Sequence, residues 1–203
     1  MPAIQDVLDV IVEPRYDTVV IPAVGATLLT FFALPRGQGV SAWQTAAGLL
    51  PKTSADTNMD LAGQLPGGYN FKLLGFRVMP AWHISDNDIH FVINPLVFTF
   101  TIGSKKFLEV PLRMMPQGNG PNGSGASMNS MGKPVLSNSY SIAKKPLDLL
   151  QTQNFQVTIT APSGQLTPST TTSFVGGANM VGAGLIGLAL TVYLDGFLYR
   201  PVQ

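Results

Sequence analysis

The amino-acid sequence predicts an all-β protein, an antiparallel β-sandwich of eight to ten short strands. Residues 155–161 alternate strictly between apolar and polar side chains, and residues 96–102 do so except at Val97; this is the period of a half-buried strand. The 21 glycines and 16 prolines indicate a chain that turns often. No self-similar unit of about 20–50 residues points to a propeller or a solenoid. These observations leave a sandwich, a jelly roll or a barrel as the expected architecture.

Residues 1–16 are expected to form a short helix or an arm. Pro2 suits a helix start, and Asp6 would lie in the first turn, where the helix dipole favours a negative charge. The apolar residues at helical spacing are Ile4, Val7, Leu8 and Ile11. Such a helix would either cover one end of the core or dock on a neighbouring subunit, and the sequence leaves both open.

Residues 17–203 are expected to form a single domain. In residues 17–34 branched and aromatic side chains predominate, with Pro22 and Gly25 as breaks, so two short strands joined by a bend are predicted. Residues 43–60 follow as a loop or one short helix.

A strong turn signal at residues 65–68, Leu-Pro-Gly-Gly, precedes a segment rich in aromatic and branched residues. We predict a strand over residues 69–79. In a regular strand Leu74, Phe76 and Val78 would share one face.

The strand at 96–102 is expected to continue into a hairpin. Residues 103–106, Gly-Ser-Lys-Lys, form its tip, and residues 107–114 return antiparallel. Pro111 has no N–H to donate, so it places the returning strand at a sheet edge or a bulge. Residues 117–133 are then expected to form a long loop of Gly, Asn, Ser, Pro and Met. Loops of this length are usually functional or disordered.

Three further elements follow that loop besides the strand at 155–161. Residues 139–143 predict a short strand, and residues 146–150 a helical turn. Residues 188–199 predict either a strand pair or one bent strand, because Asp195-Gly196 favours a hairpin turn or a bulge.

Charged residues are scarce. The chain has 12 Lys and Arg and 11 Asp and Glu, and this 11% of all residues lies far below the roughly 25% of an average soluble domain. Such a surface is expected to be buried against neighbours, most simply copies of the same chain. The net charge of +1 argues against electrostatic binding of nucleic acid. The absence of cysteine excludes disulfides, thiolate zinc sites and thiol catalysis.

Neither export nor a membrane span is favoured. Asp6 and Asp9 interrupt the apolar stretch that a signal peptide requires. The uncharged runs 18–35 and 149–194 are broken by Pro22 and by several glycines, which makes them poor transmembrane helices.

Catalytic and metal-binding patterns are weak. His83 and His90 flank a turn that holds two aspartates, but no third strong ligand completes a metal site. The glycines of residues 118–125 lack the Lys that a phosphate-binding loop needs. Ser141 and Lys144 match the S-x-x-K pattern without its companion motifs. We therefore expect no enzyme activity, no small-molecule substrate and no cofactor.

The strand inventory, the uncharged loop and the closing segment 190–201, Leu-Thr-Val-Tyr-Leu-Asp-Gly-Phe-Leu-Tyr-Arg-Pro, together resemble the jelly-roll capsid or cement (decoration) proteins of icosahedral bacteriophages. The resemblance covers architecture over most of the chain. It implies a jelly-roll sandwich that assembles into trimers, pentamers or larger arrays through loops and terminal arms, without a cofactor or catalysis. The chain departs from many capsid proteins in lacking a basic arm, which puts direct packaging of a genome in doubt.

The expected function is that of a structural virion protein, made in the host cytoplasm, whose partners are its own copies and other virion proteins. The alternative is a carbohydrate-binding β-sandwich using Trp43 or Trp82, and a cupin-type enzyme would need more than two histidines. Besides the residues of the expected helix or arm and the long loop, the Gly-rich segment 174–187 is expected to contact other subunits. The candidate interface residues are Ile4, Val7, Leu8, Ile11, Met128, Met131, Phe174, Val175, Met180 and Val181.

Overall fold

The protein is all-β. Its computed structural model describes residues 8–22, 25–42, 50–80, 95–115, 139–162, 164 and 187–202. The elements are β1 (Leu8–Val12), β2 (Arg15–Pro22), β3 (Leu28–Phe31), β4 (Asn70–Pro80), β5 (Val97–Ile102), β6 (Lys105–Pro111), the 3₁₀ turn η2 (Leu112–Met114), β7 (Tyr140–Ser141), β8 (Leu147–Leu149), β9 (Phe155–Thr160) and β10 (Gly187–Pro201). None of the described residues forms an α-helix.

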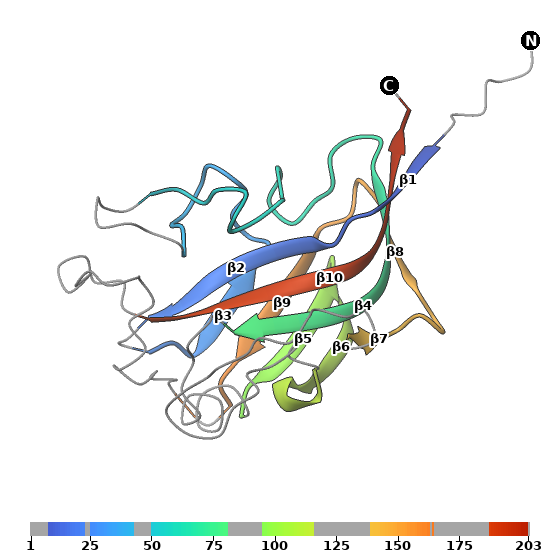
Figure 1. Ribbon diagram of the computed structural model, residues 1–203. Coiled ribbons are helices and arrows are strands. Elements are labelled where there is room, and N and C mark those ends of the chain that lie inside the picture. Colours follow the sequence, from blue (N-terminus) through green and yellow to red (C-terminus); the bar gives the residue numbers. More distant parts are fainter. Residues whose placement is uncertain are drawn as a thin grey trace, which may run out of the picture.

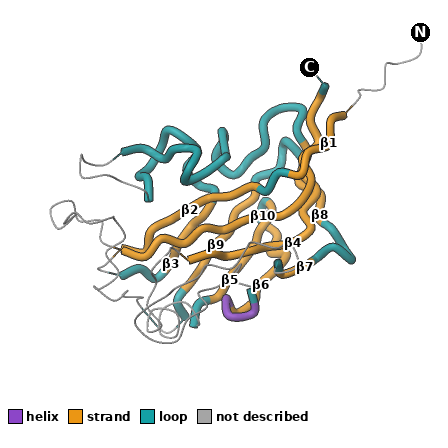
Figure 2. Tube along the Cα trace, in the orientation of Figure 1, coloured by secondary structure: helices purple, strands orange, loops and turns teal. Residues whose placement is uncertain are grey.

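The strands form two antiparallel sheets, and every strand pairing in them is antiparallel. The six-stranded sheet has the order β1-β10-β4-β7, with β2 also paired to β10 and β8 also paired to β4. The four-stranded sheet has the order β3-β9-β5-β6. Figures 1 and 2 show the two sheets as separate layers of a β-sandwich.

Aromatic side chains join the two layers. The ring of Phe76 on β4 lies 5.4 Å from that of Phe98 and 5.1 Å from that of Phe100, both on β5 of the other sheet. Both contacts are edge-to-face, the arrangement that aromatic quadrupoles favour. All three side chains are fully buried, so this contact lies at the centre of the core.

The alternating segments form the strands predicted for them. In β9 the side chains alternate between buried and half-buried along the whole strand, and in β5 they do so from Val97 to Phe100. The hairpin between β5 and β6 turns at Gly103, whose φ of 57° is left-handed. Pro111 ends β6, which is an edge strand as predicted.

A β-bulge changes the expected face of Leu74. Asp195 pairs with Gly75 and Gly196 pairs with Leu73, so Leu74 is an extra residue in β4. Phe76 is buried in the core and Leu74 is only half-buried, so the prediction that they share a face is wrong. The bulge needs glycine, because a Cβ on Gly196 would lie 2.0 Å from the backbone oxygen of Lys72.

In the described part of the expected N-terminal helix, residues 8–12 form β1 instead of a helix, and residues 1–7 lie outside the described residues. Three consecutive β-branched residues, Val10, Ile11 and Val12, favour an extended backbone. β10 supplies the partner strand over the full length of β1. Of the apolar residues at helical spacing, two lie in β1: Ile11 faces the core and Leu8 is exposed.

Residues 147–149 form β8, which pairs with β4, and not the predicted helical turn. Leu149 is fully buried there, and burial against β4 stabilises the extended form over a single turn of helix. The predicted strand at 139–143 is present as β7. The loop 117–133, residues 43–49 and 81–94, and the segment 174–186 lie outside the described residues. Within the part of the chain that the structure describes, no helix is long and apolar enough to cross a membrane.

Candidate assembly interface

Among the described strands, β1 carries three exposed large apolar side chains, and it pairs there with the C-terminal end of β10. In this ribbon Leu8 is opposite Pro201, Val10 is opposite Tyr199 and Val12 is opposite Phe197. Directly paired residues point to the same side of a sheet. We call the resulting surface the tip face; it consists of Leu8, Val10, Val12, Phe197, Tyr199 and Pro201.

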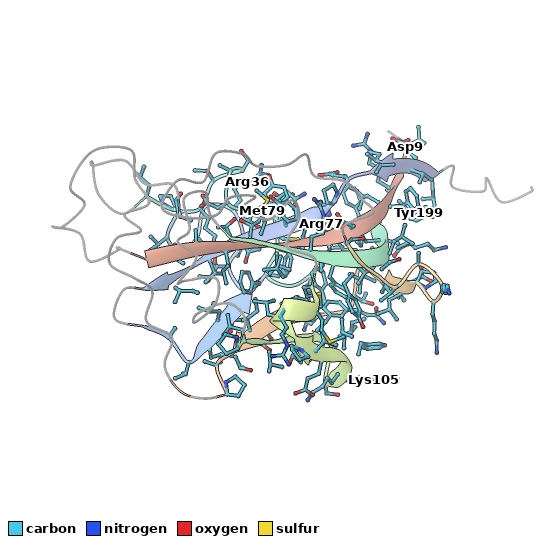
Figure 3. The ribbon with its side chains drawn as sticks, turned by 60° about the horizontal axis from the view of Figure 1, so that its bottom comes forward. Asp9, Arg36, Arg77, Met79, Lys105 and Tyr199 are labelled. Atoms are coloured by element: carbon cyan, nitrogen blue, oxygen red, sulfur yellow. The ribbon has the colours of Figure 1, made fainter. Side chains whose placement is uncertain are left out.

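The tip face is largely open to solvent. Leu8 is 43% exposed, Val10 53% and Val12 66%. Phe197 and Tyr199 are half-buried. Figure 1 shows the two strands extending together at one end of the molecule, and Figure 3 places Asp9 and Tyr199 there. Scattered exposed apolar residues are normal, but a row of them on a two-stranded ribbon is typical of an interaction surface.

The opposite side of the ribbon is different. Ile11 packs with Leu198 against the core. Nearer the end, Asp9 and Arg200 form an ion pair of 3.1 Å with both side chains 45% exposed. One side of the ribbon therefore packs against the core, and the tip face stays exposed or half-buried in the described part of the chain.

Two of the ten candidate interface residues lie in the described part of the chain. Leu8 is exposed on the tip face, as an interface residue should be. Ile11 contacts the core, so the structure does not bring it together with Leu8. The other candidates lie outside the described residues: Ile4, Val7, Met128, Met131, Phe174, Val175, Met180 and Val181.

Sequence reasoning missed Val10, Val12 and the three residues contributed by β10. The signal for the first two was the alternation Leu-x-Val-x-Val over residues 8–12, which competed with the helical spacing. Nothing local could have placed β10 beside β1.

The sheet edge is covered along β2 and open along β1. The Tyr16 amide donates to Asn58 Oδ1 at 3.0 Å, and Asp17 forms a bridge with Thr57. This covering segment lies between β3 and β4 and runs along β2 in Figure 2. Nearest to β1, Asn58 Nδ2 donates to the Pro14 oxygen at 2.8 Å and to Glu13 Oε1 at 3.2 Å. Among the described residues, β1 has only β10 as a partner strand.

A buried ion pair holds the covering segment to β2. Lys52 Nζ donates to Asp17 Oδ1 at 2.6 Å, and the Phe32 amide donates to Asp17 Oδ2 at 2.6 Å. The side chains of Asp17 and Lys52 are 0% and 5% exposed. Burial raises the pKa of the Asp17 carboxyl above its ordinary value, while Lys52 acts in the opposite direction. Because both oxygens are bonded and closed to solvent, the geometry fits a structural clamp and offers no room for a substrate.

A second ion pair joins the neighbouring strands β4 and β10 of the six-stranded sheet. Arg77 makes two hydrogen bonds of 2.7 Å to the carboxylate of Asp195. The guanidinium of Arg77, which Figure 3 labels, also lies 4.6 Å from the centre of the Tyr193 ring. Burial raises the pKa of the Tyr193 phenol, and Arg77 opposes that shift. All three groups are thus engaged with one another.

A hollow of about 270 Å³ lies beside the end of the hairpin β5–β6. Its polar lining consists of Thr101, Asn154 and Gln156, and none of its lining residues is titratable. The rings of Phe32 and Phe155 also line it, but both side chains are buried in the core. The hollow therefore offers hydrogen bonds without acid–base or nucleophilic groups.

The weak catalytic and metal-binding patterns of the sequence lie only partly within the described residues. In the described part of the chain no group of three or more acidic, histidine or cysteine residues could hold a metal ion. His83, His90 and residues 118–125 lie outside it. Ser141 Oγ accepts a bond of 3.3 Å from the Ala143 amide, which is a local turn contact.

Compared with family models, curated proteins and solved structures, the chain has no match in any of the three.

Proposed function

We propose that this chain is a structural subunit of a virus particle, a jelly-roll protein that assembles with copies of itself and with other virion proteins. The observation that carries the proposal is the tip face, an exposed apolar surface on a protein poor in charge. The proposal includes no catalytic step and no cofactor. The site of action is the virion, after synthesis in the host cytoplasm.

The strand order supports the jelly-roll assignment. β1 and β2 both pair with β10, and β7 and β8 both pair with β4, so each couple counts as one interrupted strand. Counted in this way, the first strand pairs with the eighth, the second with the seventh, the third with the sixth and the fourth with the fifth. A long hairpin folded over into two sheets has this order, and it defines the double Greek key of a jelly roll.

The fold alone does not decide the function, because capsid proteins, lectins and cupins all use jelly rolls. The distribution of charged side chains helps to distinguish between these three classes of protein. Among the described residues, six intramolecular ion pairs occupy 12 of the chain's 23 charged side chains. Each pair joins one basic and one acidic side chain, so six basic and five acidic residues lie outside these pairs, a balance that does not favour binding of nucleic acid. Dense packing of copies is the function that this distribution fits best.

A carbohydrate-binding module is the alternative. The hollow beside the β5–β6 hairpin has the hydroxyl and amide groups that hydrogen-bond sugars. Sugar sites also use an exposed aromatic face for stacking, and the rings of Phe32 and Phe155 are buried. The observation therefore favours this function less than the tip face favours assembly.

The test is the mass of the purified protein at micromolar concentration, measured by native mass spectrometry and by sedimentation velocity. We expect oligomers for the wild-type chain. Val10→Lys should shift the protein to monomer, because it places a charge in the tip face. Leu28→Lys is the matched control, since Leu28 on β3 is also 53% exposed, and it should leave the oligomers intact. A wild-type monomer that binds a glycan on an array would replace assembly by the alternative.

A further inference from the structure

We infer that β1 pairs antiparallel with β1 of a second copy, across a two-fold axis that passes beside Val10. The inference rests on the proposed self-assembly and specifies its contact. Pairing of this kind joins the six-stranded sheets of two copies into one continuous sheet, and it places the two tip faces side by side.

The first argument is that, among the residues that the structure describes, β1 is an unprotected edge. Natural edge strands are protected by prolines, lysines, bulges, very short length or a covering segment. β6 carries Lys105, Lys106 and Pro111, and β7 and β8 are two and three residues long. β2 is covered by the segment around Asn58. β1 has five residues and none of these protections, and its one charge, Asp9, is already paired with Arg200.

The second argument is that the sequence of β1 is complementary to itself in one register. With Val10 opposite Val10, Leu8 lies opposite Val12 and Asp9 opposite Ile11, so all five residues are paired. A shift of two positions in one direction places Asp9 opposite Asp9, and in the other direction opposite Glu13. Like charges directly opposite each other destabilise a strand pair. A shift by an odd number of residues would place the tip face of one copy beside the core side of the other, because side chains alternate between the two faces of a strand.

The occupant is therefore a second copy of this chain. A two-fold contact uses the same surface on both subunits, which is the closed arrangement that most homo-oligomers adopt. Each backbone hydrogen bond makes a net contribution of about 0.5–1.5 kcal/mol to stability. A pairing only five residues long is therefore weak alone and depends on the apolar contact that the adjoining tip faces add.

Single cysteines test the axis, because the chain has no cysteine of its own. Opposed residues of an antiparallel pair have Cα atoms about 4.5 or 5.5 Å apart, and a disulfide spans both distances. Val10→Cys should form a disulfide-linked dimer under mild oxidation. Val12→Cys is the control on the same face: it is more exposed, but two copies of residue 12 would lie about 13 Å apart along the strands. Leu28→Cys reports random collisions.

Charge pairs test the register independently. In the proposed pairing, residue 8 of one copy is opposite residue 12 of the other. Leu8→Lys combined with Val12→Glu should retain the oligomer, because each Lys meets a Glu. Leu8→Lys combined with Val12→Lys should give monomers. Both variants carry two new charges at exposed positions, so circular dichroism should show the same fold for both.

The outcomes separate this inference from the proposed function. Selective cross-linking of Val10→Cys, together with the charge-pair result, supports the β1 pairing. Oligomers that persist while Val10→Cys cross-links no faster than the two controls would overturn the pairing and leave assembly standing. A wild-type chain that stays monomeric would overturn both.

Discussion

Replacement of Lys52 by Met tests whether the buried ion pair between Lys52 and Asp17, the clamp, holds the covering segment against β2. The substitution keeps the length of the side chain and removes its charge, so Asp17 loses the bond of 2.6 Å and stays buried. Removal of one partner from a buried ion pair costs about 3–5 kcal/mol. The free energy of unfolding at pH 7 should fall by that amount, as measured by urea denaturation followed by circular dichroism. This is a large share of the roughly 5–15 kcal/mol of a typical domain.

The exposed pair Arg36–Asp60 is the matched control within the same part of the chain. Its side chains are 52% and 53% exposed, so solvent screens the charges. Arg36→Met should change the free energy of unfolding by less than about 0.5 kcal/mol. The double variant Asp17→Asn with Lys52→Met should recover most of the loss, because no buried charge is left unpaired.

The effect of pH follows from the raised pKa of Asp17. A carboxyl group whose pKa is higher in the folded state than in the unfolded state stabilises the fold at low pH and loses this contribution as the pH rises. Lys52 lowers the pKa of Asp17, so Lys52→Met should raise it further. The difference in unfolding free energy between wild type and Lys52→Met should therefore shrink from pH 7 towards pH 4. A constant difference, or a loss below about 1 kcal/mol at pH 7, would refute the clamp.

Three further outcomes are expected. Phe76→Ala should lower the free energy of unfolding in urea by about 3–5 kcal/mol, because it removes the ring that joins the two sheets. Gly196→Ala should leave little folded protein by circular dichroism, since its Cβ would meet backbone at 2.0 Å, whereas Gly103→Ala meets no atom within 4 Å and should cost only about 1–2 kcal/mol of backbone strain. Arg77→Met should raise the pKa of Tyr193 in an ultraviolet titration, and an unchanged or lower value would contradict the contact between the two side chains.

The strands with the clearest alternation were predictable because their neighbours in space impose the same period. β5 and β9 pair with each other, with Phe98 opposite Ile159 and Phe100 opposite Val157. Each strand therefore buries one face against the other sheet, and a period of two follows directly. Burial of one face therefore produces an apolar–polar alternation that can be recognised in the sequence of each strand on its own.

The face of Leu74 and the nature of β1 were not predictable in the same way. The bulge in β4 arises from its pairing with β10, more than 100 residues later in the chain, and the two glycines that permit it are ambiguous when read alone. In β1, five residues are too few to separate a strand from a helical turn. The deciding partner is again distant: Asp9 and Arg200 are 191 residues apart.

The candidate interface was predicted in part for a related reason. Scarcity of charge is a property of composition, so it was visible at once and predicted association. The surface itself combines β1 with β10, and only Leu8 of its six residues was anticipated. The clamp was missed altogether, because Asp17 and Lys52 are 35 residues apart and neither stands in a recognisable motif.

The late position of β10 in the chain has a consequence for timing during synthesis. β10 lies between β1 and β2 on one side and β4 on the other, yet it is the last strand that the ribosome makes among those described. Until residues 187–201 emerge, β1, β2 and β4 lack the strand with which all three pair. Pairings between strands so far apart in the sequence form slowly. The surface that would join two copies is thus completed last. A nascent chain whose β10 has not emerged lacks Phe197, Tyr199 and Pro201 of the tip face, so the proposed contact between copies would form only after these residues leave the ribosome.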